Sequence, residues 1–337
     1  MRESINTIGL PKTLLYYRYS ALWKTFFEEL GLTVVVSPDT DRAILEAGDA
    51  ASIDECCLAS KVYCGHVEWL ISKCDAIFVP AFASDNVRCG FCTKYQSLPD
   101  MIRNTFREQL AASHCEVLSI YIPDISKPKK VREAYLNLAK SLGASPRDAS
   151  RAYKRAVRAQ RVLDASRAKA QAEALALIKQ YQKLAEKDAT NAEAKNVPLP
   201  ILVVGHPYIT HDAFVADDVI HGIEEAGGFV LYADETDHDR AYKRSFEFSD
   251  TLPWEINREL VGAMLELEGS VAGIVLMSAF PCGPDSLFAD ALVRDISDIP
   301  VLRLTLDAQS GSAGVQTRIE SFMDILQYQA KGGYLNG

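Results

Sequence analysis

A regular alternation of strand-like and helix-like segments over residues 198–337 is the feature that most constrains the fold of this chain. Short apolar segments typical of buried strands lie at 201–204, 229–232, 274–277 and 301–306. Segments with helical spacing of apolar residues follow them at 217–226, 254–268, 284–294 and 313–329. Strands that alternate with helices in this way form parallel sheets with right-handed crossovers. The pattern therefore predicts a C-terminal α/β domain over 198–337.

The N-terminal part of the chain has the same alternation in a less regular form. Strands are expected at 6–10, 33–36, 76–82 and 117–122, and helices at 14–30, from Asp54 onward, and at 98–110. This order indicates a second α/β unit, here an N-terminal domain over 1–126.

Composition changes in the middle of the chain, between about residue 127 and residue 197. This stretch is rich in Ala, Lys, Arg, Gln and Glu, and 152–187 has the apolar stripe of a long amphipathic helix. We interpret it as a helical insert or linker, with a partner-docking coiled coil as the alternative. The predicted fold class is thus α/β, with two Rossmann-like or flavodoxin-like parallel-sheet domains and a helical segment between them.

Charge and hydropathy narrow the classes of partner and the expected location. A net charge of −9 argues against a nucleic-acid surface, which needs clustered positive charge. No apolar run approaches the roughly 18 residues of a membrane span, and residues 1–8 lack the apolar core of a signal peptide. We therefore expect a cytoplasmic protein that binds neither nucleic acid nor membranes.

Cysteines are concentrated in one stretch, where six of the eight lie between residues 54 and 92. Thiols stay reduced in the cytoplasm, so this clustering favours metal or redox chemistry over disulfides. Cys89 and Cys92 have the spacing that lets two thiolates reach one iron–sulfur cluster or one zinc ion. A pair of loop cysteines without any ligand is the alternative.

Three further cysteines of this stretch lie on one expected helix. Cys57 and Cys64 would share a face, roughly 10 Å apart at ~1.5 Å per residue. Cys56 would point about 100° away from Cys57, so a small metal site could not easily use both thiols. If both are ligands, the cofactor must be extended; packing of Cys56 as a small residue is the alternative.

Cys282 lies beyond the strand expected at 274–277 and before a helix opened by Pro284 and Asp285. This is the carboxyl end of a parallel sheet, where open α/β sheets place their ligands. Because Cys92 follows the strand of the first domain in the same way, we expect a metal centre in a cleft between the two domains. Cys74 and Cys115 flank strands and are expected to be structural.

Few other residues are candidates for chemistry. His206 closes a strand within Gly205-His206-Pro207-Tyr208, as a proton donor or as an ordinary loop histidine. Glu55, His206 and Asp285 are acid–base candidates by placement only. Residues 305–307 and 311–314 precede the last helix and suit a phosphate, a carboxylate or a tight turn. The sequence contains no phosphate-binding loop of the G-x-x-x-x-G-K-[ST] type.

Several motifs together resemble a known group of proteins. They are Ile8-Gly9-Leu10-Pro11, Leu15-Tyr16-Tyr17, Trp23-Lys24-Thr25-Phe26-Phe27, Asp54-Glu55-x-Cys57, Cys92-x-Lys94-Tyr95-Gln96-x-Leu98-Pro99-Asp100, Gly205-His206-Pro207-Tyr208, Ser278-x-Phe280-x-Cys282-Gly283-Pro284-Asp285-Ser286 and Thr305-Leu306-Asp307. The chain resembles the acyl-CoA dehydratase activase-related proteins, which belong with the 2-hydroxyacyl-CoA dehydratase and double-cubane cluster proteins.

The resemblance implies an iron–sulfur cluster held between the domains by Cys57, Cys92 and Cys282. The cluster would be a single cubane (4Fe-4S) or a double cubane (8Fe-9S). In the second case Cys56, Cys64 and Cys89 would supply the three additional thiolates. Relatives of this kind receive electrons from a separate ATP-hydrolysing iron–sulfur activator, work under anaerobic conditions, and suggest a homo- or heterodimer.

The resemblance leaves the activity open. The leading hypothesis is low-potential reduction, or reductive radical dehydration, of a small molecule or a 2-hydroxyacyl-CoA by a dehydratase-like lyase or a double-cubane reductase. A non-catalytic electron-transfer or accessory protein that docks an activator or a dehydratase is the second hypothesis. A structural zinc protein is the third.

Overall fold

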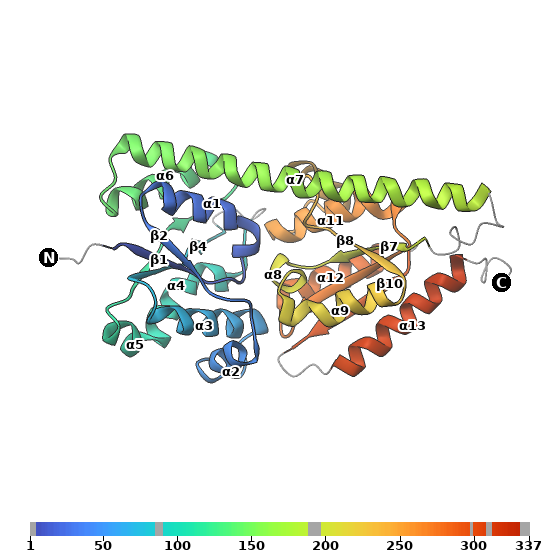
Figure 1. The fold of residues 1–337 in the computed structure, drawn as a ribbon, viewed down its shortest axis with the longest axis horizontal. Coiled ribbons are helices and arrows are strands. Elements are labelled where there is room, and N and C mark those ends of the chain that lie inside the picture. The colour runs from blue at the N-terminus through green and yellow to red at the C-terminus, as the bar shows by residue number, and fades with distance from the viewer. Residues whose placement is uncertain (1–4, 85–89, 188–196, 297–298, 308–311, 331–337) are drawn as a thin grey trace. The chain divides into compact units, whose positions relative to one another are not determined.

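The computed structural model describes residues 5–84, 90–187, 197–296, 299–307 and 312–330. The chain divides into two compact units, each built around a parallel sheet (Figure 1). Unit 1 comprises Met1–Leu163 and Thr251–Ile256, and unit 2 comprises Asp164–Asp250 and Asn257–Gly337.

The main sheet of unit 1 has four parallel strands in the order β2-β1-β3-β5. These strands are β1 (Thr7–Leu10), β2 (Thr33–Val36), β3 (Ala76–Phe78) and β5 (Glu116–Leu118). The two central strands, β1 and β3, are largely buried; Ile8, Leu10 and Ile77 have no exposed surface. Burial on both faces explains the continuous apolar runs in the sequence.

Further along the chain, a separate two-stranded parallel sheet pairs β4 (Ala81–Phe82) with β6 (Tyr121–Ile122). The sequence predicted one continuous strand at 76–82, which was wrong in detail because Pro80 interrupts it. Proline has no N–H to donate to a ladder. Pairing resumes at once on either side, with the Val79 amide donating to the Leu118 carbonyl at 2.8 Å and the Ala81 amide to Ile120 at 2.8 Å.

Six helices of unit 1 surround these strands. They are α1 (Tyr16–Glu29), α2 (Arg42–Ala50), α3 (Leu58–Ile71), α4 (Thr93–Thr105), α5 (Arg107–Ala112) and α6 (Pro128–Ser141). Aromatic rings of α1 pack in the core. The ring centroids of Phe27 and Phe78 are 5.0 Å apart, and those of Phe26 and Tyr135 are 5.1 Å apart. The Trp23 indole also donates a 3.0 Å hydrogen bond to the Tyr135 hydroxyl, which ties α6 to this core.

The predicted long helix is present as α7 (Pro146–Lys187), 42 residues in length. Ser145 precedes the helix, and its hydroxyl accepts a hydrogen bond from the Asp148 amide at 3.1 Å. Small buried residues pack its first half against unit 1, namely Ala149, Ala152 and Ala156. In its second half the Gln171 side chain pairs with the backbone of Tyr232 in unit 2, accepting at 2.6 Å and donating at 2.9 Å.

Unit 2 repeats the strand arrangement of unit 1 in the order β10-β9-β7-β8, all parallel. Its strands are β7 (Leu199–Val204), β8 (Gly228–Tyr232), β9 (Gly273–Ala279) and β10 (Val301–Leu306). In both units the first strand is central, with the second strand on one side and the third on the other. The predicted fold class, two parallel-sheet domains with a helical segment between them, is confirmed.

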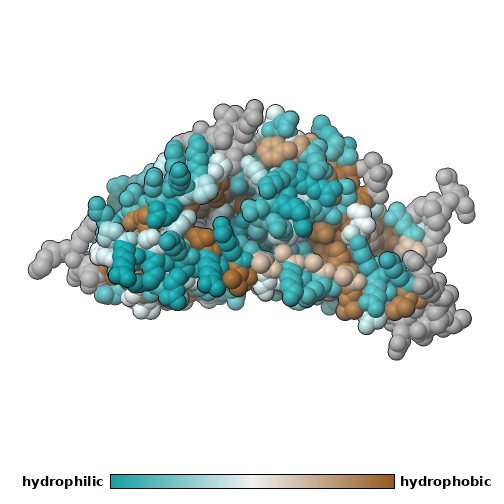
Figure 2. Space-filling view, turned by 90° about the horizontal axis from the view of Figure 1, so that it is seen from above, coloured by the Kyte–Doolittle hydropathy of each residue, from teal (hydrophilic) through white to brown (hydrophobic). Residues whose placement is uncertain are grey.

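Six helices and one short 3-10 turn belong to the described part of unit 2. The helices are α8 (Pro207–Thr210), α9 (Ala213–Glu225), α10 (His238–Phe248), α11 (Glu255–Leu267), α12 (Gly283–Asp295) and α13 (Ser312–Ala330). No helix in the described ranges combines the length and the apolar character needed to cross a bilayer. The face seen in Figure 2 is accordingly mostly hydrophilic, with smaller hydrophobic areas between.

Candidate functional site

The sheet of unit 2 has a topological switch point between β7 and β9. The chain leaves β7 toward β8 on one side and reaches β9 on the other, so the two connections diverge at the carboxyl ends of the strands. Such a point forms a crevice where open α/β sheets bind ligands. The connection after β7 carries His206, and the connection after β9 carries Cys282.

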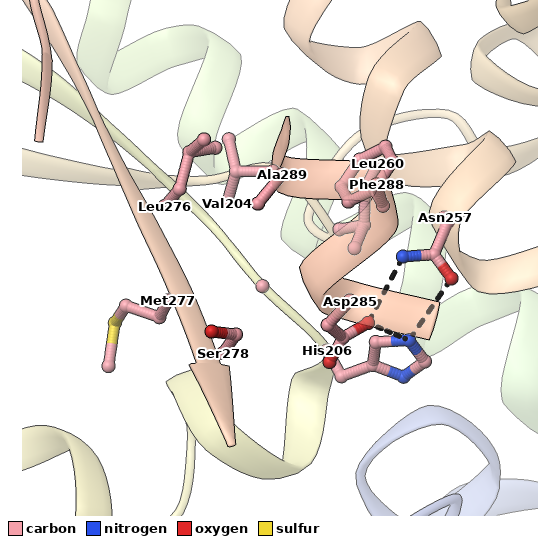
Figure 3. A pocket seen from close by; sticks show the side chains of 11 residues that line it. Val204, His206, Asn257, Leu260, Leu276, Met277, Ser278, Asp285, Phe288 and Ala289 are labelled. Carbon is pink, nitrogen blue, oxygen red and sulfur yellow. Dashed lines mark hydrogen bonds and ion pairs between the residues drawn. The ribbon is translucent and has the colours of Figure 1, made fainter. Parts of the chain in front are cut away.

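Three polar side chains meet at this switch point, from three different elements (Figure 3). His206 Nε2 lies 3.2 Å from Asp285 Oδ1 and 3.4 Å from Asn257 Oδ1. The Asn257 amide nitrogen donates to Asp285 Oδ1 at 3.2 Å. All three are buried, with 9% of His206, 1% of Asn257 and 4% of Asp285 exposed. His206 and Asp285, two of the residues predicted from sequence, are therefore brought together.

Burial and ion pairing shift the pKa values of His206 and Asp285 in opposite directions. Burial by itself lowers the pKa of His206, but attraction to Asp285 and the hydrogen bonds to Asp285 and Asn257 outweigh it, so the pKa is raised. Burial likewise opposes ionisation of Asp285, yet His206 holds the Asp285 pKa below its ordinary value. The pair therefore favours an imidazolium beside a carboxylate.

His206 and Asp285 each have one further polar side-chain atom, which takes no part in this pairing. His206 Nδ1 and Asp285 Oδ2 are buried and have no hydrogen-bond partner among the described residues. A narrow cavity adjoins them, lined also by Val204, Met277 and Ser278. Its volume is about 10 Å³, which is room for about one water molecule. The cluster can hold charge and a water molecule, but the cavity cannot admit an acyl chain.

Cys282 lies next to this cluster as the N-cap of α12. Asp285 is three residues further on, in the first turn of the same helix, and the hydrogen bond between the Cys282 thiol and the Asp285 carboxylate contributes to the low pKa of Asp285. The sequence prediction that Cys282 sits at the carboxyl end of its strand and opens a helix is confirmed.

Unit 1 carries two further cysteines at helix starts. Cys57 is the N-cap of α3, and its Sγ lies 3.3 Å from the Ser60 hydroxyl. Cys92 is the N-cap of α4. Lys94, in the first turn of α4, places its ammonium group 3.7 Å from Cys57 Sγ. A side chain from the start of α4 therefore reaches the start of α3 and places a cation beside Cys57 Sγ.

The prediction that one helix, capped by Asp54, carries Cys56, Cys57 and Cys64 was wrong. Residues before Cys57 form a turn, in which the Cys56 amide donates to the Ile53 carbonyl at 3.0 Å, and α3 begins only at Leu58. Cys56 and Cys57 are thus outside the helix. Cys64 is inside it but faces the core, with 2% of its surface exposed, and burial raises the pKa of its thiol to about 11.

The remaining predicted residues have different surroundings. Glu55 is exposed in the turn before α3. Cys89 lies outside the described residues. Cys74 and Cys115 are buried at the starts of β3 and β5, and burial together with the neighbouring Cys115 thiol raises the pKa of Cys74. Their burial agrees with the structural role expected for them.

The described helices have N-caps of two kinds, some with a side chain that bonds a first-turn amide and others, the cysteines among them, without such a bond. Asp41, Asp212 and Asp237 cap α2, α9 and α10 with a carboxylate that accepts an amide of the first turn. The thiols of the cysteine caps of α3, α4 and α12 make no such capping bond. Free amides at a helix N-terminus stabilise negative charge, including that of a thiolate.

Sequence reasoning missed two residues of these sites. Asn257 belongs to no motif and lies in the first turn of α11, a helix whose start is not close to His206 in the sequence. Lys94 was noted only as part of a family motif. Across the described residues, no three His, Cys, Asp or Glu side chains form a group that could hold a metal ion.

Fold and site together define a class: an α/β protein of two parallel-sheet units with cysteines at the N-termini of three helices. Residues 7–235 match the family described as CoA enzyme activase uncharacterised domain (DUF2229). Since the match spans more than half of the chain, the chain belongs to this family. The activase-related part of the resemblance seen in the sequence is thereby confirmed.

Other comparisons add little. No curated protein matches the chain. Among solved structures, the C-terminal domain of glucosamine-fructose-6-phosphate aminotransferase from Francisella tularensis aligns with 98% of this chain and 84% of that chain, at 10% identity and a TM-score of 0.22. A TM-score this low carries no argument about fold or function.

Proposed function

We propose that this chain is an iron–sulfur protein that works with a CoA enzyme and uses Cys57, Cys92 and Cys282 as cluster ligands. Its activity would be activator-dependent, low-potential reduction of a small molecule or reductive dehydration of a 2-hydroxyacyl-CoA. The observation that carries the proposal is that each of these three cysteines is the N-cap of a helix and leaves the first-turn amides of that helix without a side-chain cap.

These surroundings suit thiolate ligands. Cluster iron is bound by thiolates, which are stabilised at helix N-termini and near cations. Cys57 has both features, because Lys94 lies 3.7 Å from its sulfur. Cys282 has the cap position, at the start of a helix whose first-turn amides lack a side-chain cap. The donor set therefore fits an iron–sulfur cluster in chemical type.

When bound, such a cluster would supply a single electron at low potential. The chain's own residues would bind and orient it: the three thiols as ligands, the Lys94 ammonium as a counter-charge, and the His206–Asp285 pair as fixed charges near Cys282. The family resemblance implies that ATP hydrolysis would belong to a separate activator protein.

The number of cubanes depends on the other cysteines. A double cubane with three thiolates for each half needs Cys56, Cys64 and Cys89 as well. The buried, protonated state favoured for Cys64 argues for a single cubane unless α3 rearranges. Anaerobic preparations with about four irons per chain would support one cubane, and about eight would support two.

The proposal is tested by anaerobic purification followed by iron and sulfide analysis, absorption near 400 nm and EPR of the reduced protein. Cys57→Ser, Cys92→Ser and Cys282→Ser are each expected to lose most of the iron. Cys115→Ser is the matched control, because its thiol is buried near another thiol and caps no helix. Equal iron in all four variants, or a colourless protein that holds zinc, would refute the proposal.

A non-catalytic accessory role is the second candidate. The observation that favours it is the small cavity beside His206 and Asp285, which has room for about one water molecule and none for an acyl substrate. In that case the reduced protein would pass electrons to a partner CoA enzyme but would not consume 2-hydroxyacyl-CoA by itself. Turnover by the isolated reduced chain would exclude this role.

A further inference from the structure

The segment between residues 127 and 163 has a charge opposite to that of the rest of the chain. It contains eleven Lys and Arg residues but only two Asp and Glu residues, a net charge of +9 in a chain that carries −9 as a whole. The remainder of the chain therefore carries −18. All eleven cations are exposed. Positive charge concentrated in this way on one exposed segment indicates a binding partner of the opposite sign.

Five of these cations form a row along the first half of α7, which we call the basic stripe. Its members are Arg147, Arg151, Lys154, Arg158 and Arg161. Their alternating spacing of four and three residues places them on one face of the helix. At ~1.5 Å per residue the row is ~21 Å long.

The face of α7 opposite the basic stripe is fixed against unit 1. Ala152 and Ala156 lie on it and have no exposed surface. Gln160 is buried on the same face, and its side-chain oxygen accepts the Leu22 amide of α1 at 3.0 Å. The helix cannot turn about its axis without breaking these contacts, so the basic stripe is held on the outer side.

Most cations of the segment have no counter-charge within the chain. In the described ranges, only Lys127, Arg151 and Arg155 of the eleven form an ion pair. Lys154 and Arg158, at the centre of the basic stripe, form none. Like charges three or four residues apart destabilise a helix. Carboxylates from another molecule would remove this repulsion.

The basic stripe lacks the side chains with which proteins usually bind nucleic acids. Such proteins add aromatic rings that stack on bases, or amides that read them, to their cations. The stripe has only Arg and Lys. A nucleic acid would also extend beyond ~21 Å and meet a chain whose remaining charge is −18. A protein partner can confine its carboxylates to the length of the stripe.

Membrane binding is disfavoured for a separate reason. A basic helix that lies on a bilayer inserts an apolar face into it. On α7 the face opposite the stripe is buried against the protein, and Val162 is the one exposed large apolar side chain of the fully described segment 127–163. Nothing in this segment could therefore anchor it in lipid.

We propose that the basic stripe is the docking surface for a protein partner that presents the acidic face of an α-helix. Side chains on one face of any helix recur at intervals of three and four residues, so carboxylates of the partner can face the cations one by one. Four of the five cations are arginines, whose planar guanidinium binds a carboxylate through two hydrogen bonds. The proposal goes beyond the proposed function, because it requires no cluster.

The test uses the full chain and a fluorescent Ala-rich helical peptide of about 20 residues, with glutamates at i, i+4, i+7, i+11 and i+14. A second peptide of the same composition distributes its glutamates around the helix. Fluorescence anisotropy at about 0.15 M salt gives the two dissociation constants. We expect the first peptide to bind ~10-fold more tightly, because only its carboxylates can all face the stripe.

Two double variants locate the binding surface. Lys154→Glu with Arg158→Glu reverses the centre of the stripe and should weaken the first peptide at least ~10-fold. Lys129→Glu with Lys130→Glu is the matched control, because both lysines are exposed on α6 and the net charge changes equally. The control should weaken binding ~2-fold or less. If circular dichroism shows that the first variant does not fold, Lys154→Gln with Arg158→Gln replaces it, with a loss in the same direction.

Equal binding of the two peptides, or equal losses in the two double variants, would mean that only overall charge matters and would overturn the proposal. Tighter binding of a short RNA duplex or of phosphatidylserine vesicles than of the first peptide would overturn it as well. Iron is measured in the same preparations. Wild type without iron refutes the proposed function and leaves the peptide result standing, and the stripe variant should hold as much iron as wild type.

Discussion

Unit 2 holds charged side chains in its interior as ion pairs between histidine and aspartate. A second pair, besides His206 and Asp285, is His211 with Asp234, whose Nε2 and Oδ2 atoms are 2.8 Å apart. Burial alone would lower the pKa of His211, but Asp234 outweighs it and raises the pKa. Asp234 has its own pKa lowered, against the effect of burial, by the same neighbour. Both side chains are mostly buried, so solvent screens the pair weakly.

The pH dependence of stability follows from the raised pKa of His211. A raised folded-state pKa means that the stabilising contribution is complete below the ordinary pKa of histidine, about 6.5, and is lost as pH rises through the higher folded value. Asp234→Asn should therefore lower the free energy of unfolding by about 1–3 kcal/mol at pH 6. The difference from wild type should shrink toward pH 9.

Urea unfolding at both pH values measures this effect. Asp217→Asn is the control, because Asp217 is exposed on α9 of the same unit and its loss should change little. A difference between wild type and Asp234→Asn that grows with pH would contradict the assigned charge state.

Thiol reactivity should distinguish two cysteines that the sequence treated alike. Cys57 is partly exposed with an ammonium group 3.7 Å from its sulfur, whereas Cys64 is buried and its pKa is raised to about 11. Only the thiolate reacts with iodoacetamide. In cluster-free protein at pH 8 we expect Cys57 to be alkylated at least ~10-fold faster than Cys64.

Peptide mass spectrometry over a time course measures the two rates in one sample. Lys94→Gln should slow Cys57 and leave Cys64 unchanged, which provides an internal reference. Equal rates for the two cysteines in folded protein would mean that α3 opens readily and that Cys64 is available as a ligand.

At the scale of elements, the position of Cys57 depends on how closely α2 and α3 approach each other. Glycines form this contact. A Cβ atom at Gly65 would lie 1.9 Å from the carbonyl oxygen of Ile44, and a Cβ atom at Gly48 would lie 1.9 Å from the carbonyl oxygen of Lys61. Backbone atoms cannot give way as a flexible side chain can. The absence of two side chains therefore sets the distance between these helices.

Gly65→Ala should force α2 and α3 apart and destabilise unit 1 by about 1–3 kcal/mol or more. Gly269→Ala is the matched control, since a Cβ there meets nothing within 4 Å. Thermal unfolding followed by circular dichroism compares the two variants. An unchanged melting temperature for Gly65→Ala would show that the helices can separate at no cost.

The elements also show where sequence reasoning succeeds and fails. Buried parallel strands such as β7 and β9 were predicted well, because both faces are apolar and glycines or prolines bound them. Helix α2 was missed because it is short and contains Gly48, which looks like a break. The start of α3 was misplaced because Asp54 is a common N-cap residue and Cys57 is not. The existence of α2 and the start of α3 depend on the packing of these two helices against each other, which the sequence alone does not show.

At the scale of the whole molecule, unit 1 is not one continuous piece of chain. Thr251–Ile256 returns to it from within the sequence of unit 2. Trp254 forms a parallel bridge with Gly90, and the Glu255 amide donates to the Gly90 carbonyl at 2.8 Å. The returning segment thus contacts the connection that leads into Cys92.

Glu255→Pro removes the N–H that donates this hydrogen bond. Glu255 is the first residue of α11, a position that accepts proline, and the extended Trp254 before it suits a following proline. We expect the free energy of unfolding to fall by about 1 kcal/mol. Glu255→Ala keeps the N–H and isolates the effect of the charge. Equal stability of the two variants would mean that the bridge contributes nothing.

This whole-molecule arrangement explains what the sequence could not reveal about the site. The carboxyl-end positions of His206 and Cys282 follow from strand order and were predictable. Asn257 was not, because its role depends on α11 beginning beside two strand ends that are distant in sequence. Polar residues that act only through tertiary contacts leave no local pattern.

The cysteine N-caps have a consequence for the evolution and engineering of the chain. Serine at such a position would accept a first-turn amide and add about 0.5–2 kcal/mol per helix. Selection for heat resistance alone would therefore replace Cys57, Cys92 and Cys282 by better caps, as happens where function and stability compete. Serine variants of the three should melt no lower than wild type in cluster-free protein, so loss of iron in them would report lost ligation rather than unfolding.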